Sequence, residues 1–179
     1  MNFRRWRTES SSVKFENDYW SYYIDQFSIE NGISGDYHYV HTEGSTIIVP
    51  VLPDKNFLLI NQYRYLNKKS GIEFPCGGVK RGLTPDENAQ KELREETGYL
   101  ARNLTKVGEF TPFTGAADEI SHVFVARDLE YAPLQMDATE DIEILICSRK
   151  KVEEFIKTNQ MWDGLSLAAW SLTNHLFDE

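Results

Sequence analysis

Residues 77–99 constrain this chain more than any other segment, because they describe a glycine loop followed by a helix whose two ends are both marked. Thr84 is expected to be the N-cap, with Pro85 in the first helical position and Glu87 closing a capping box. Gly98 supplies the left-handed residue that ends such a helix. The segment therefore predicts a short helix of fixed register directly after a loop.

Three glutamates share one side of this expected helix. Glu92, Glu95 and Glu96 fall within an arc of roughly 100°, while Ala89 and Leu93 lie on the face that can pack inward. Like charges at these spacings destabilise a helix by about 0.2–0.5 kcal/mol per pair. The carboxylates alone fit a solvated acidic face. The marked helix ends and the glycine loop favour a cation site instead, and hard cations such as Mg2+ prefer oxygen ligands.

The segment resembles the Nudix box: glycine, five residues, glutamate, seven residues, then Arg-Glu-aliphatic-x-Glu-Glu-x-Gly-aliphatic. The positions that match are Gly77, Glu92, Leu93, Glu95, Glu96 and Gly98. Three positions depart from it: Leu83 replaces the first glutamate, Lys91 the arginine, and Tyr99 the last aliphatic residue. Lys91 keeps the charge but loses the forked guanidinium that orients a carboxylate. The resemblance implies an α/β fold, the Nudix-type α/β/α sandwich with a mixed sheet.

The composition fits a folded, acidic protein. Apolar residues make up 41% of the 179 residues, and the net charge is −9. A net negative charge is unlike the basic surface of a nucleic-acid binder. An anionic substrate would need bound metal and particular Arg or Lys residues to enter such a negative field. Cys76 and Cys147 are too few for a disulfide framework. With no apolar run long enough to span a membrane, we expect a cytoplasmic protein with neither nucleic-acid nor membrane partners.

Two regions are expected along the chain. Residues 1–44 are aromatic and irregular, with strand-like runs, and form an N-terminal β segment; residues 45–179 form the Nudix hydrolase domain. Strands are expected at 45–52, 56–62, 104–110, 120–127 and 141–147, and two closing helices at about 149–159 and 164–177.

Outside the box, the sequence is similar to the ADP-ribose and nucleotide-sugar pyrophosphatase branch of the family. The segments that carry this resemblance are Gln62-Tyr63-Arg64, Glu73-Phe74-Pro75-Cys76-Gly77, Asp118-Glu119, and Glu140-Asp141-Ile142-Glu143. Thr114 stands where the ADP-ribose branch commonly has proline. That departure weakens ADP-ribose as the specific substrate and leaves other NDP-sugars or dinucleotides open.

The resemblance implies a metal site for Mg2+ or Mn2+. Its ligands would be the carboxylates of Glu92 and Glu96 and the backbone carbonyl of Cys76, which stands where the branch has alanine. Glu95 would lie near the same cluster and take part in catalysis. The thiol of Cys76 is expected to be a small buried group.

The resemblance also implies that Arg64 contacts a substrate phosphate, although an arginine at a strand end is as often a surface cation. Glu140 would be a mobile-loop carboxylate that completes the metal site or deprotonates the attacking water, with Glu119 the less favoured alternative. On residue type alone, Glu140 could simply be a solvated residue of an acidic segment, and Glu119 a solvated residue of a turn. Trp6 and Trp20 could stack on a base, but we expect them in a core or an interface.

The predicted reaction is hydrolysis of the pyrophosphate bond in a nucleoside diphosphate linked to a small group, such as ADP-ribose or an NDP-sugar. The products would be a nucleoside monophosphate and a phosphorylated remainder. Leu83 and Lys91 leave open a weak or inactive nucleotide-binding protein, and a Nudix nucleoside triphosphatase is the other alternative. In the resembled branch, N-terminal strands exchange between two subunits, which implies a homodimer formed through residues 1–44.

Overall fold

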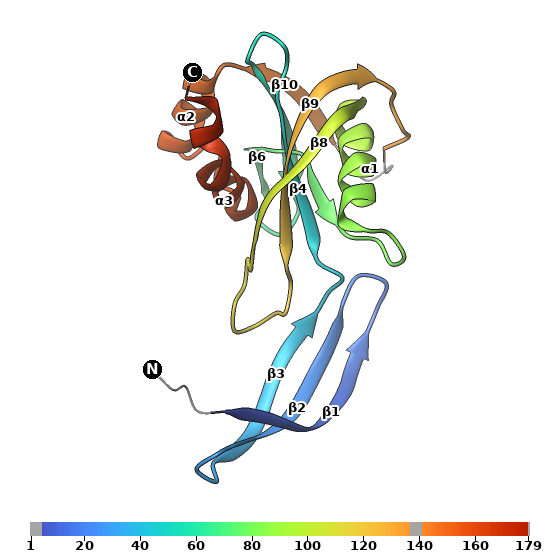
Figure 1. Ribbon diagram of the computed structural model, residues 1–179, viewed down its shortest axis with the longest axis vertical. Helices are drawn as coiled ribbons and strands as arrows, with labels where there is room; N and C mark the ends of the chain where they lie inside the picture. Colours follow the sequence, from blue (N-terminus) through green and yellow to red (C-terminus); the bar gives the residue numbers. More distant parts are fainter. Residues whose placement is uncertain (1–4, 137–140, 179) are drawn as a thin grey trace.

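The computed structural model describes residues 5–136 and 141–178. The chain forms a three-stranded N-terminal sheet and a larger α/β body, and the two lie end to end (Figure 1). The N-terminal strands are β1 (Trp6–Glu16), β2 (Ser21–Ile29) and β3 (Ser34–His41), which pair antiparallel in the order β1-β2-β3. β1 was not expected, because its polar, serine-rich sequence lacks the alternation that identifies a strand; pairing with β2 supplies the order.

The body contains two sheets. Its strands are β4 (Ser45–Pro50), β5 (Phe57–Arg64), β6 (Lys69–Glu73), β7 (Cys76–Gly78), β8 (Tyr99–Phe110), β9 (Ser121–Tyr131) and β10 (Ile142–Cys147). One sheet has the order β7-β4-β9-β8 and is mixed, because β4 and β9 run parallel while the other pairs are antiparallel. The other sheet, β10-β5-β6, is antiparallel. The five expected body strands are present within a few residues, except that β8 begins earlier, and β6 and β7 were not anticipated.

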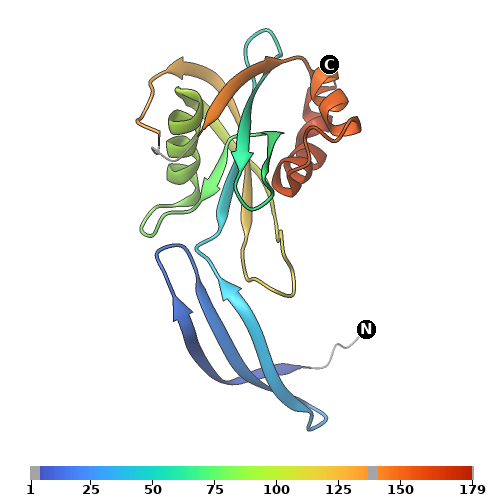
Figure 2. The ribbon, with the colours of Figure 1, turned by 180° about the vertical axis from the view of Figure 1, so that it is seen from behind.

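The helices cover both sides of the body. They are α1 (Pro85–Thr97), α2 (Arg149–Lys157), α3 (Gly164–Thr173) and the short 3-10 turn η1 (Asn174–Phe177). Seen from the front and from behind, α1 lies on one side of the strands and α2 with α3 on the other (Figures 1 and 2). The predicted α/β/α sandwich with a mixed sheet is confirmed. Among the described residues, no helix is long and apolar enough to cross a membrane.

Strand β4 is buried on both faces and divides the core in two. Ile47 and Val49 face a cluster that includes Phe57 and Trp170, on the side of α2 and α3. Ile48 faces the smaller cluster under α1. All three β4 residues are fully buried, as expected for a central strand covered by helices on both sides.

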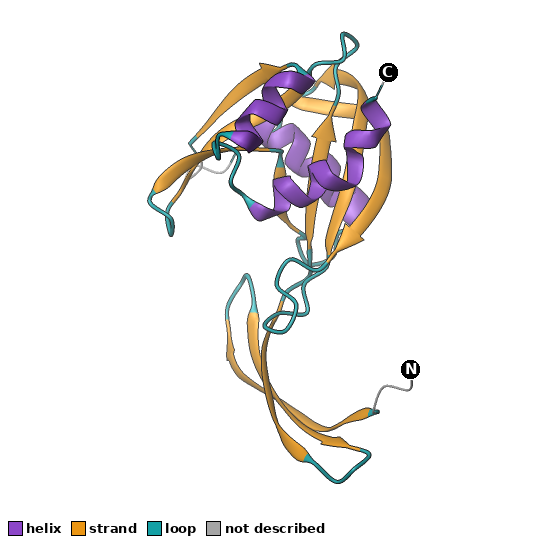
Figure 3. Ribbon diagram, turned by 90° about the vertical axis from the view of Figure 1, so that its left-hand side faces the viewer, coloured by secondary structure: helices purple, strands orange, loops and turns teal. Residues whose placement is uncertain are grey.

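The N-terminal sheet is fastened to the body through the loop between β8 and β9. The Val40 amide donates to the Ala116 carbonyl at 2.9 Å, and the Asp118 amide donates to the Val40 carbonyl at 3.1 Å. His41 Nδ1 lies 2.7 Å from the Asp118 carboxylate. The side view shows loops of the body meeting the end of this sheet (Figure 3). The end of β3 is therefore held by backbone and side-chain contacts together.

Candidate active site

The glutamate helix begins and ends where the sequence predicts. The Thr84 side chain accepts from the Glu87 amide at 3.3 Å, and the Glu87 carboxylate accepts from the Thr84 amide at 2.8 Å. Gly98 has a φ of 79° and its amide donates to the Arg94 carbonyl at 3.1 Å. The capping box and left-handed stop are confirmed, so the register of the three glutamates is fixed locally.

The acidic side of α1 is largely buried and is not a solvated surface. Glu92 is 7% exposed and Glu96 4% exposed, while Ala89 and Leu93 are fully buried on the inward face as predicted. Burial raises the pKa of Glu92, with the charge of Lys91 opposing this and that of Glu95 adding to it. Burying carboxylates carries a desolvation cost, which nearby positive charge and hydrogen-bond donors can offset.

Lys91 supplies part of that positive charge. Its ammonium group forms an ion pair with Glu95 and lies 3.4 Å from Glu92 Oε1. Burial disfavours the charged amine, but the hydrogen bond to Glu95 and the neighbouring carboxylates raise the pKa of Lys91 overall. The lysine that departs from the Nudix box therefore binds two of the three glutamates directly.

The glycine loop presses against the helix carboxylates. A Cβ atom at Gly77 would lie 2.5 Å from Glu92 Cδ, closer than real Cβ contacts allow. The Cys76 amide donates to Glu96 Oε2 at 2.9 Å. Gly77 is thus required for the close approach of β7 to α1, and the loop and helix form one rigid cradle.

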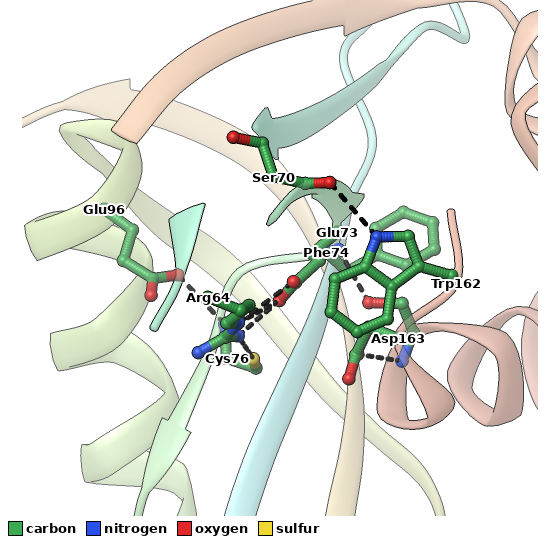
Figure 4. A network of polar contacts seen from close by, with 9 residues as sticks. Arg64, Ser70, Glu73, Phe74, Cys76, Glu96, Trp162 and Asp163 are labelled. Carbon is green, nitrogen blue, oxygen red and sulfur yellow. Dashed lines mark hydrogen bonds and ion pairs between the residues drawn. The ribbon is translucent and has the colours of Figure 1, made fainter. Parts of the chain in front are cut away.

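Arg64 reaches into this region but is already bound to a buried acid. Its Nε donates to the two carboxylate oxygens of Glu73 at 3.0 and 3.1 Å, and its Nη2 pairs with the same carboxylate (Figure 4). Nη2 also lies 3.7 Å from Cys76 Sγ. Burial raises the pKa of the Glu73 carboxyl and Arg64 opposes this, while the hydrogen bond to Glu73 raises the pKa of Arg64. The phosphate contact of Arg64 stays a prediction, and it would use the edge of the guanidinium that Glu73 leaves open.

The neighbouring β6–β7 segment is held by Ser166 of α3 and by Trp162, which precedes that helix. Trp162 Nε1 donates to the Ser70 carbonyl at 3.1 Å, and the Phe74 amide donates to Ser166 Oγ at 3.0 Å (Figure 4). Asp163 caps α3 by accepting from the Ser166 amide at 2.8 Å. These contacts hold the chain on either side of Glu73, and so they position Arg64 indirectly. The Cys76 thiol is buried as expected, and burial raises its pKa.

A cavity of about 630 Å³ lies between the cradle and the N-terminal sheet. It is lined by the tip of the β1–β2 hairpin, the β3–β4 link, the cradle and the end of β5; its residues include Tyr19, Trp20, Glu43, Gln62, Arg64, Cys76, Gly77, Lys80, Arg81, Glu92, Glu95, Glu96 and Glu119. Five of the six predicted site residues therefore line one cavity. Glu140, the sixth, lies outside the described residues.

Several cavity residues were missed from the sequence. Tyr19 and Trp20 lie at the hairpin tip, where the Asn17 side chain accepts from both of their amides at 2.8 and 2.9 Å. Arg81 spans the junction, with Nη2 3.8 Å from Glu16 and Nε 3.5 Å from Glu43. The available signal was the Asn-Asp-Tyr-Trp turn, but nothing local indicates that this turn faces residues some sixty positions away.

Glu119 is held on the cavity wall by Ser45, which in turn contacts Ser121. Ser45 Oγ donates to Glu119 Oε1 at 2.7 Å, and the hydroxyls of Ser45 and Ser121 lie 2.7 Å apart. Both serines are buried. Glu119 is therefore oriented by its neighbours and is more than a solvated turn residue.

The donor chemistry of the cradle fits a hard divalent cation. Glu92 and Glu96 are two nearly buried carboxylates; Lys91 lies beside Glu92, and the Cys76 amide donates to Glu96. A bound cation would relieve the desolvation of Glu92. Within residues 5–136 and 141–178, no three His, Cys, Asp or Glu side chains converge closely enough to form a complete metal site. Any ion here would need further oxygens from backbone, water or substrate.

Known proteins place this chain in one family. The NUDIX domain model matches residues 42–165. The ADP-ribose pyrophosphatase of Bacillus subtilis (strain 168) is 28% identical over 144 residues, which cover 79% of this chain and 78% of that protein. The GDP-mannose pyrophosphatase of Escherichia coli (strain K12 / DH10B) is 31% identical over 153 residues, which cover 78% of each.

A solved structure agrees at the level of the fold. The crystal structure of an ADP compounds hydrolase matches with a TM-score of 0.85 and 18% identity, covering 98% of this chain and 96% of that one. The family match extends over more than half of the chain and includes the whole glutamate helix. This chain therefore belongs to the NUDIX domain family, and the prediction of a Nudix hydrolase is confirmed.

Proposed function

We propose that this Nudix protein hydrolyses the pyrophosphate bond of a nucleoside diphosphate linked to a small group, either ADP-ribose or an NDP-sugar. The products are a nucleoside monophosphate and a phosphorylated remainder. One observation carries the proposal: a single cavity joins the carboxylate wall of α1 to the aromatic hairpin tip at Tyr19 and Trp20. Relatives named ADP-ribose pyrophosphatase and GDP-mannose pyrophosphatase support the same substrate class.

In this proposal, Glu92, Glu96 and the Cys76 carbonyl hold Mg2+ or Mn2+. A bound divalent ion supplies neutralisation of phosphate charge and a water of lowered pKa. Glu95 is held close to this cluster by its ion pair with Lys91. The cradle contact between Cys76 and Glu96 keeps the ligands in place before substrate arrives.

The remaining residues bind and orient the substrate. Arg64 contacts a phosphate oxygen through its open guanidinium edge, and Tyr19 and Trp20 offer aromatic surface for the base. Glu140 is the proposed general base and Glu119 the alternative. Glu119 lines the cavity and keeps one carboxylate oxygen clear of its bond to Ser45.

A panel of ADP-ribose, NDP-sugars, dinucleotides and NTPs with Mg2+ or Mn2+, followed by product analysis, tests the reaction. We expect the highest kcat/KM for ADP-ribose or an NDP-sugar, a nucleoside monophosphate as product, and no turnover after EDTA treatment. Preference for NTPs would reassign the chain to the triphosphatase class. No turnover of any compound would reject the enzyme.

A second candidate is a nucleotide-binding protein with little activity, and Lys91 favours it. Its ammonium group pairs with Glu92 and Glu95 but lacks the forked guanidinium with which the arginine of the Nudix box can orient a carboxylate. Tight nucleotide binding without turnover, restored to turnover by Lys91→Arg, would select this candidate.

We also propose that residues 1–44 form a dimerisation segment, that residues 45–179 form the hydrolase domain, and that the protein works as a cytoplasmic homodimer without nucleic-acid or membrane partners. Support for the dimer comes from exposed apolar side chains on the N-terminal sheet, including Trp6 at 58% and Phe15 at 53%. Light scattering at micromolar concentration should give twice the mass of the 20.7 kDa chain, and a monomer would overturn the dimer.

A further inference from the structure

The side chain of Gln62 is buried with one end unsatisfied. Gln62 is 8% exposed, and its Oε1 is a buried atom without a hydrogen-bond partner in the part of the chain that the structure describes. Gln90 shows the usual arrangement, since its Nε2 donates to the Ala101 carbonyl at 2.6 Å and its Oε1 accepts from the Ala101 amide at 3.1 Å. Buried polar atoms are nearly always paired, so the exception at Gln62 requires an explanation.

The position of Gln62 indicates where the missing partner comes from. Gln62 lies two residues before Arg64 on β5, so both side chains leave the same face of the strand, and both line the cavity. Its cross-strand neighbours are Gly71 and Ile142, and neither has a side-chain donor. Since no described residue donates to Gln62 Oε1 and the side chain lines the cavity, a molecule bound in the cavity is the remaining source of a partner.

The chemistry of the cavity limits which groups can be the missing hydrogen-bond donor. Arg64 and Arg81 are donors in the cavity lining, but Arg64 is bound to Glu73 and Arg81 is paired with Glu16 and Glu43. The carboxylates of the acidic wall and the oxygens of an ionised diphosphate are acceptors, so neither can satisfy a carboxamide oxygen. A hydroxyl group can. Resting on the proposed function, we propose that Gln62 Oε1 accepts a hydrogen bond from an O–H donor of the reactants, which is either a sugar hydroxyl of the substrate or the attacking water.

The test replaces the carboxamide by an apolar group of similar shape, Gln62→Met, with Gln90→Met as the matched control. Removing an unsatisfied buried oxygen should raise Tm by about 2 °C, whereas Gln90→Met should lower Tm because it removes two satisfied bonds. A lower Tm for Gln62→Met would overturn the proposal, since the carboxamide would then be paired inside the folded protein.

Two functional measurements distinguish the two donors. If a sugar hydroxyl is bound, Gln62→Met should raise the Kd for ADP-ribose, measured calorimetrically in EDTA, by about 3- to 10-fold. The Kd for ADP should rise as well if the ribose of the nucleoside supplies the hydroxyl, and should stay unchanged if the terminal ribose, which ADP lacks, supplies it. If the attacking water is bound, Kd should stay constant while kcat with Mg2+ falls about 10- to 100-fold. Gln90→Met should keep both constants. Unchanged Kd and kcat in Gln62→Met would contradict both forms of the proposal.

Failure of the proposed function has a different signature, namely a wild-type protein that neither binds nor cleaves any nucleotide in the panel. The Tm comparison between Gln62→Met and Gln90→Met does not depend on that result.

Discussion

Strands β4 and β1 show how differently the two regions of this molecule are stabilised. Every residue of β4 is buried, whereas all but one of the 11 residues of β1 are exposed. The body thus follows the usual layered plan, with helices covering a hydrophobic sheet on both sides. The N-terminal sheet has the backbone pairing of a sheet without a second layer.

What holds the N-terminal sheet is cross-strand contact. Trp6 and Phe27 have ring centroids 4.6 Å apart, and Tyr23 and Tyr39 stack at 5.3 Å. Such pairs contribute roughly 0.2–1 kcal/mol each, far less than a buried core side chain. The body is stabilised by buried hydrophobic clusters, whereas the N-terminal sheet relies on cross-strand pairs and on its contacts with the β8–β9 loop.

Core truncation in the two regions should give the largest difference. Phe124→Ala removes a fully buried ring under α1 and should lower the free energy of unfolding by about 3–5 kcal/mol. Phe15→Ala, at a side chain that is 53% exposed, should cost less than about 1 kcal/mol in the isolated chain. Urea unfolding at two protein concentrations measures both. A concentration-dependent loss in Phe15→Ala would show that a partner subunit covers this ring.

The carboxylates of the cradle should matter for activity about as much as the buried core matters for stability. Glu96→Gln keeps an oxygen that can accept from the Cys76 amide, so the fold should survive, but the lost charge should reduce kcat/KM by at least about 100-fold. Glu130→Gln, on the surface of β9, is the control and should remain near wild type. Full activity of Glu96→Gln would refute its assignment as a metal ligand.

Alanine substitutions at the neighbouring residues Gly77 and Gly78 form a matched pair with smaller expected effects. Gly77→Ala would press a methyl group into the Glu92 carboxylate and should destabilise the protein by about 1–3 kcal/mol, with a loss of activity. A Cβ at Gly78 meets nothing nearer than the Gly44 carbonyl at 4.0 Å, so Gly78→Ala should change stability by less than about 0.5 kcal/mol. Equal effects in thermal unfolding and assay would show that the close approach is unimportant.

His122 in β9 should produce the smallest effect, as a dependence of stability on pH. Burial lowers the pKa of His122, Lys106 adds to this and Glu109 opposes it. The native state therefore binds fewer protons than the unfolded chain, so stability is complete above pH about 6.5 and declines as pH falls through 6.5 toward the lower native pKa. His122→Gln should flatten this decline in melting curves between pH 7.5 and 5. A native pKa above 6.5 by NMR titration would contradict the sign.

Prediction from sequence succeeded where the determinants are local. The caps at Thr84 and Gly98 fix α1, and its glutamates share one wall of the cavity, because helix register depends on neighbours three or four residues apart. The apolar strands of the body could also be predicted from their local sequence. β6 and β7 were missed because short strands rich in glycine carry little periodic signal.

The remaining parts of the site depend on distant contacts. The pairing of Arg64 with Glu73 joins two strands, and its only hint was a lone acid within the apolar run Gly71–Phe74. Trp20 was left out of the site, yet it lines the cavity because the fold brings the hairpin tip to the glycine loop. Assignments such as these require the tertiary arrangement of strands, which local patterns do not specify.

The loop between β8 and β9 sets a limit on how this chain can change length. From exposure alone, residues 111–120 would be chosen as a place to accept inserted residues. The loop is instead tied at Val40 by backbone hydrogen bonds and at Ser45 through Glu119. Added residues there would displace the N-terminal sheet and a cavity carboxylate together.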